Sequence, residues 1–60
     1  MCQVAVYLDG EKILENVILV EPTNEGIRLV AMFEPVQIIP AEIRQIDLMK
    51  NIILLEKVKE

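Results

Sequence analysis

Short runs of alternating apolar and polar residues recur along the chain, separated by residues that favour turns. The first run, "QVAVYL" at residues 3–8, is followed at once by Asp9–Gly10, a favoured pair for a tight hairpin turn. Further strands are predicted at residues 12–20, 27–33, 34–40, 43–48 and 52–58, with the turn-forming segment "EPTNEG" at residues 21–26. Five to six short antiparallel strands at this spacing predict one all-β domain over residues 1–60, closed into a small β-barrel that leaves no sheet edge free.

Residues 41–50 fit two readings. Ile43, Ile46 and Met49 follow Pro40 at helical spacing, which would suit a helix that begins after the proline. However, Asn51 ends the pattern quickly and a run rich in β-forming residues follows it. We therefore favour a strand for this segment and keep the helix as the alternative.

Several predicted strands are apolar on both faces. In residues 17–20, Val17 and Leu19 alternate with the equally apolar Ile18 and Val20, and 53% of the whole chain is hydrophobic, with a mean hydropathy of +0.41. A small barrel has room inside for one of these two faces, so the other would form an exposed apolar patch of the kind that marks partner contacts. The simplest partner is a second copy related by a twofold axis, although scattered exposed aliphatic side chains are also common on protein surfaces.

Charge and composition disfavour several classes of function. The net charge is −4 and the six Lys and Arg residues are scattered, which disfavours nucleic acid as a partner. The apolar runs are far shorter than the roughly 20 residues of a membrane span, and neither a leader nor a second cysteine is present, so a cytoplasmic, non-membrane protein is expected. Because the chain lacks histidine, serine and a glycine-rich phosphate loop, we predict that it is not an enzyme.

Cys2 is the single cysteine. It could be an inert thiol at the start of a strand. Its position also places a thiolate beside its own backbone nitrogen and the terminal amine of Met1, and these three atoms could form two fused five-membered chelate rings around a metal ion. Sulfur combined with such nitrogens favours square-planar Ni(II) or Cu(II), and Ni(II) is preferred because a thiolate tends to reduce Cu(II). If Met1 were removed, each chain would offer one amine and one thiolate, and two chains could complete a site together.

The amino-terminal Met–Cys pair, "DGEKILENV", "EGIRLV" and the closing "IRQIDLMKNIILLE" resemble the CooT family over nearly the whole chain. The closing motif comprises Ile43, Ile46, Asp47, Leu48, Ile53, Leu55 and Glu56. The resemblance implies a small SH3-like β-barrel that forms a homodimer and binds Ni(II) through Cys2, with a nitrogen contribution from Met1. It also implies a nickel chaperone that serves carbon monoxide dehydrogenase or another nickel enzyme as its client.

Two other functions remain open at this point. Small β-barrels often bind RNA, but this chain has only Tyr7 and Phe33 as aromatic side chains on which bases could stack. A metal-free dimeric module, whose second apolar face docks another protein, would explain the hydrophobicity equally well and would make no use of Cys2.

Overall fold

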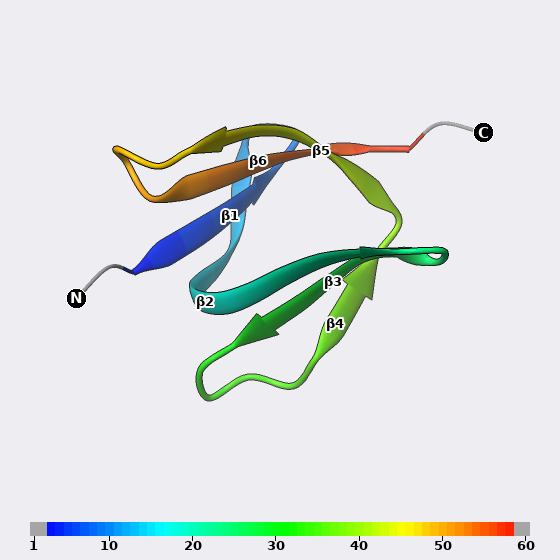
Figure 1. Cartoon of the computed structure of the whole chain (residues 1–60), viewed down its shortest axis with the longest axis horizontal. Coiled ribbons are helices and arrows are strands. Elements are labelled where there is room, and N and C mark those ends of the chain that lie inside the picture. Colours follow the sequence, from blue (N-terminus) through cyan, green and yellow to red (C-terminus); the bar gives the residue numbers. More distant parts are fainter. Residues whose placement is uncertain (1–2, 59–60) are drawn as a thin grey trace.

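The computed structural model describes residues 3–58, and every regular element in that part of the chain is a β-strand (Figure 1). The strands are β1 (Val4–Leu8), β2 (Glu11–Thr23), β3 (Gly26–Ala31), β4 (Gln37–Ile39), β5 (Ala41–Asp47) and β6 (Ile52–Lys57). The all-β prediction is confirmed, and so is the choice of a strand over a helix for residues 41–47. Within the described range, no helix has the length and apolar character needed to cross a bilayer.

The predicted turns have the backbone conformations that their residues favour. Asp9 and Gly10 both have positive φ, 52° and 87°, which is the signature of a type I′ hairpin between β1 and β2. Between β2 and β3, the hydroxyl of Thr23 donates to the carbonyl of Gly26 at 2.8 Å and accepts from the amide of Glu25 at 3.2 Å. Asn51, with φ 56°, ends the turn that leads into β6.

β2 is one long strand that pairs with two neighbouring strands. Its first half pairs with β1 as far as Val17, and its second half pairs with β3 from Val17 to Thr23. Asn16, just before this change of partner, has φ 56°, and the register shifts on both sides of it. These irregularities bend the strand, as bulges do, and in Figure 1 β2 turns sharply where it passes from one neighbour to the other.

The six strands form a single sheet in the order β4-β3-β2-β1-β6-β5. Four of the neighbouring pairs are antiparallel, but β1 and β6 pair in parallel. The prediction that all strands are antiparallel is therefore wrong for this pair. A parallel pair needs a long crossover connection, and here β2 to β5 supply it between the first and last strands.

The prediction of a closed barrel is not confirmed, because no described pairing joins β4 to β5 at the two ends of the sheet. The chain explains why these neighbours in sequence do not form a hairpin. Only Pro40 separates Ile39 from Ala41, whereas the tightest common hairpin loop has two residues. β5 instead crosses over and pairs with β6.

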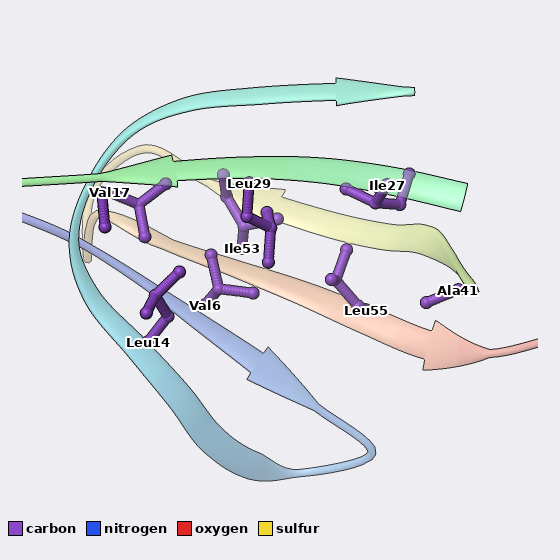
Figure 2. Packing of buried hydrophobic residues seen from close by; sticks show 9 residues of the cluster. Val6, Leu14, Val17, Ile27, Leu29, Ala41, Ile53 and Leu55 are labelled. Carbon is purple, nitrogen blue, oxygen red and sulfur yellow. The ribbon is translucent and has the colours of Figure 1, made fainter. Parts of the chain in front are cut away.

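The core lies between the two curled halves of the sheet (Figure 2). Leu29, Leu55 and Val6 are its most deeply buried large side chains, and they come from three different strands. The full buried cluster is entirely apolar and consists of Val6, Leu14, Val17, Ile27, Leu29, Ala31, Ala41, Ile53 and Leu55. β3 shows the expected alternation clearly, because every second residue from Ile27 onward is buried.

Candidate metal centre at the amino terminus

The two residues predicted to bind metal, Met1 and Cys2, lie outside the described part of the chain. Their nearest described neighbourhood is therefore the start of β1. There the amide of Ala5 donates to the carbonyl of Asn51 at 3.0 Å, and Val4 lies opposite Val17 of β2. The parallel pairing of β1 with β6 places the start of β1 beside the β5–β6 turn. Figure 1 shows the start of β1 and this turn on the same side of the molecule.

Beside the start of β1 the sheet has a hollow of about 140 Å³, which we call the apolar opening. Its lining is entirely apolar and consists of Val4, Val17, Ile18, Leu19, Val20 and Ile53. Val17 and Ile53 also belong to the core, so the opening leads directly to buried residues. Ile18, by contrast, is 65% exposed at the rim.

β5 also leaves an apolar side chain partly exposed on the inner side of the sheet. Ile46 pairs directly with the buried Ile53, and residues directly opposite on neighbouring strands share a face of the sheet. Ile46 therefore points to the core side, yet it is 52% exposed. An apolar side chain on the inner face with half of its surface in water indicates a core that the single chain does not close.

The β5–β6 turn beside the opening adds two further apolar side chains. Leu48 and Met49 are 81% and 94% exposed. Asp47 holds this turn, because its Oδ1 accepts the amides of Met49 at 3.1 Å and Lys50 at 3.0 Å. The apolar pattern predicted an uncovered face but not this location, since nothing in the sequence reveals that the turn lies beside the start of β1.

The opposite end of β1 is acidic. Asp9, Glu42 and Glu56 line a second hollow there together with Lys57, whose backbone amide donates to Asp9 Oδ1 at 3.3 Å. These carboxylates do not converge, and across residues 3–58 no three Asp, Glu, Cys or His side chains gather closely enough to hold a metal ion.

Known proteins match this chain both in fold and in sequence, including the amino-terminal residues. The model of the family described as "CO dehydrogenase accessory protein CooT" matches residues 1–56, a range that includes Cys2. The chain belongs to the CooT family. The resemblance inferred from the sequence is therefore confirmed, and an accessory protein of carbon monoxide dehydrogenase is not a catalyst, in agreement with the prediction of a non-enzyme.

Two relatives extend the CooT assignment. A protein proposed to be CooT of Carboxydothermus hydrogenoformans has a crystal structure that matches this chain with a TM-score of 0.85 and 31% identity, over 97% of this chain and 100% of that one. An uncharacterized protein of Methanocaldococcus jannaschii is 32% identical over 56 residues, which are 93% of this chain and 98% of that protein. Both matches span this chain and the matched protein almost end to end.

Proposed function

We propose that this CooT protein is a cytoplasmic nickel chaperone for maturation of carbon monoxide dehydrogenase or a related nickel enzyme. It holds Ni(II) through Cys2 across a homodimer of SH3-like domains. The observation that carries the proposal is the family match, which spans residues 1–56 and so includes the one cysteine. An accessory protein of a nickel enzyme whose single thiol stands at residue 2 is well suited to carry that metal.

The chemistry follows from the donors that residues 1 and 2 provide. Two thiolates, one from each chain, would satisfy half of a square-planar Ni(II), and nitrogens from the Met1 amine or the backbone would complete it. Because thiol and amine ligands must lose their protons to bind, nickel affinity should rise with pH. Ligands at a chain end are also easily exchanged, which suits a protein that must release its metal to a client.

The surroundings of β1 support a shared site rather than a site within one chain. Val4 lines the apolar opening together with aliphatic side chains, and no three Asp, Glu, Cys or His side chains gather anywhere in residues 3–58. Two peptide units, each spanning about 3.8 Å between Cα atoms, join Cys2 to Val4. A thiol tethered this closely to a hydrophobic hollow finds its second sulfur most readily on another copy of the chain.

Nickel titration followed by near-ultraviolet absorption tests the proposal. The wild-type protein should develop sulfur-to-nickel charge-transfer bands that saturate at about half an equivalent per chain. Cys2→Ser should abolish these bands while leaving the β-sheet circular dichroism unchanged, because Cys2 precedes the first strand.

Met49→Leu is the matched control, because it removes another sulfur from the same end of the molecule at a side chain that is 94% exposed. This variant should bind nickel as the wild type does. Undiminished nickel uptake by Cys2→Ser would place the site elsewhere. Absence of nickel uptake by the wild type would leave the metal-free dimeric module as the better description.

A further inference from the structure

We propose that the loop between β3 and β4, together with the free edge of β2, forms a groove that binds an extended segment of the client enzyme. We call this surface the docking groove, and it is lined by residues 12–16 of β2, residues 32–34 of the loop and Gln37 of β4. The inference rests on the proposed function, because it takes the client to be the carbon monoxide dehydrogenase that this accessory family serves. It commits to a client segment that carries a large apolar side chain beside a Lys or Arg.

The first half of β2 has an unpaired edge. From Glu11 to Asn16 this strand pairs with β1 on one side, whereas its pairing with β3 on the other side begins only at Val17. One further backbone hydrogen bond joins the amide of Met32 to the carbonyl of Asn16 at 3.0 Å, and the chain then turns away at Phe33. Among the strands in residues 3–58, none pairs with this edge, so its outward peptide groups are available to an added strand.

Phe33 is held in solvent by a strained backbone conformation. Its φ is 68°, which bulky L-residues rarely adopt, and the residue is 91% exposed. Glycine would satisfy this turn without strain but would present no ring. Because the ring gains almost no burial from its own chain, the strain is not offset by packing, and strained residues of this kind cluster at binding sites. A ring that is already fixed in place loses little conformational entropy when a partner covers it.

The neighbours of Phe33 make this surface apolar and concave. Met32 and Val36, from the same loop, are 46% and 52% exposed. The docking groove has a volume of about 410 Å³, which lies within the size range of protein binding clefts. Exposed apolar side chains around a hollow mark a contact with a partner, and aromatic anchors carry much of the binding energy at protein interfaces.

Charge indicates which partner fits the docking groove. Lys12 Nζ and Glu15 Oε1 lie 3.1 Å apart, so these two charges offset each other. Glu34 takes part in none of the ion pairs formed within residues 3–58, which leaves the groove with a net negative charge. A Lys or Arg of the client would complement Glu34, and the total charge of −4 would speed encounter with a basic surface. A second copy of this chain, which carries the same negative charge, is a poorer occupant.

Phe33→Gly and Ile38→Ala form a matched pair for the test. Ile38 is exposed and adjoins Gln37 on β4, but side chains alternate along a strand, so it points to the face opposite the groove. Titration calorimetry of the full chain with the purified apo form of carbon monoxide dehydrogenase from the same organism, in metal-free buffer, measures the dissociation constant. Phe33→Gly should raise it by about thirtyfold or more, the loss expected for an aromatic anchor, whereas Ile38→Ala should leave it unchanged.

Two further measurements distinguish docking from a structural role. Phe33→Gly relieves a positive φ, so its urea midpoint should equal or exceed that of the wild type, and weaker binding then cannot come from unfolding. Glu34→Lys should weaken binding by about tenfold at low ionic strength and by less at high ionic strength, because salt screens the attraction between charges.

Hydrogen–deuterium exchange reports the strand pairing directly. When the apo-enzyme binds, amides within residues 11–16 should exchange more slowly, because the added strand accepts their outward hydrogen bonds. Amides within residues 26–31 belong to β3, which already has β2 on one side and β4 on the other, and their exchange should not change.

The outcomes separate the docking groove from the proposed nickel function. Phe33→Gly should lose enzyme binding while its nickel titration matches the wild type. A wild type that takes up nickel but does not bind the apo-enzyme, binding that Phe33→Gly leaves intact, or unchanged exchange in residues 11–16 would overturn the groove and leave the nickel function standing. Enzyme binding that depends on Phe33 in a protein that takes up no nickel would do the reverse. Loss of self-association in Phe33→Gly would assign the groove to a second copy and overturn the proposal.

Discussion

Gly26, at the start of β3, should tolerate no side chain. Its φ is 137°, and a Cβ built on it would collide with the carbonyl oxygen of Ile39 and lie 2.8 Å from the carbonyl carbon and 3.0 Å from Pro40 Cα. These are backbone atoms, so no side-chain rotation can relieve the contact. Gly26→Ala must therefore displace the segment that joins β4 to β5.

Gly10 provides the matched comparison. It also has positive φ, 87°, but a Cβ there would meet no atom within 4 Å. Gly10→Ala should lose about 1 kcal/mol of the free energy of unfolding, from backbone strain partly offset by a less flexible unfolded chain. Gly26→Ala adds the collision to the strain of its own positive φ, and we expect a loss of about 3 kcal/mol, in the range of other steric backbone defects.

The loss is large for a domain of this size. At roughly 0.05–0.15 kcal/mol per residue, a chain of 60 residues has a total stability of about 3–9 kcal/mol. The extra 2 kcal/mol in Gly26→Ala should lower the midpoint temperature by about 10 °C relative to Gly10→Ala. Urea unfolding should be followed by circular dichroism in metal-free buffer at one fixed protein concentration, because association and bound metal both raise the apparent stability. Equal stability of the two variants, within about 0.5 kcal/mol, would refute the steric reasoning.

Two further substitutions test local backbone features by the same urea assay. Phe33 has φ 68° and is 91% exposed. Phe33→Gly should therefore relieve backbone strain without loss of buried surface and raise the free energy of unfolding by about 0.5 kcal/mol. Destabilisation by Phe33→Gly would show that the ring packs against a partner. Asp47→Ala removes the acceptor for two turn amides and should lower the free energy of unfolding by about 1 kcal/mol, whereas Asp47→Asn, which keeps an acceptor oxygen, should lower it less. Equal losses in the two Asp47 variants would show that these hydrogen bonds contribute little.

The strands could be predicted because their signals are local. Alternation located β1 and β3, a run of β-forming residues located β6, and Asp9–Gly10 located the first hairpin turn. The ends of strands were less predictable. β2 continues to Thr23 through Pro22, where the sequence suggested a turn, because this half of β2 pairs with β3 alone and a missing amide can face solvent. β3 stops at Ala31, before the predicted end at Phe33, because the chain turns there.

The arrangement of the strands could not be predicted in the same way. Periodicity indicates which residues share a face, but pairing between distant strands depends on the whole chain. The parallel contact of β1 with β6 is such a pairing, and it alone brings Asn51 to Ala5. The sequence thus predicted a second apolar face, and only the topology shows that the apolar opening lies beside the start of β1.

The proposed function couples metal binding to association of the two chains. If two thiols share one ion, nickel binds the dimer in preference to the monomer, and the metal must then strengthen association by the factor by which association strengthens metal binding. A residue at the interface between the chains that contacts no metal ion would in this way influence nickel affinity through the monomer–dimer equilibrium. A client that separated the two chains would leave each thiol with half a site and weaken the hold on the metal. Release could then follow from docking alone, without any catalytic group in the chain.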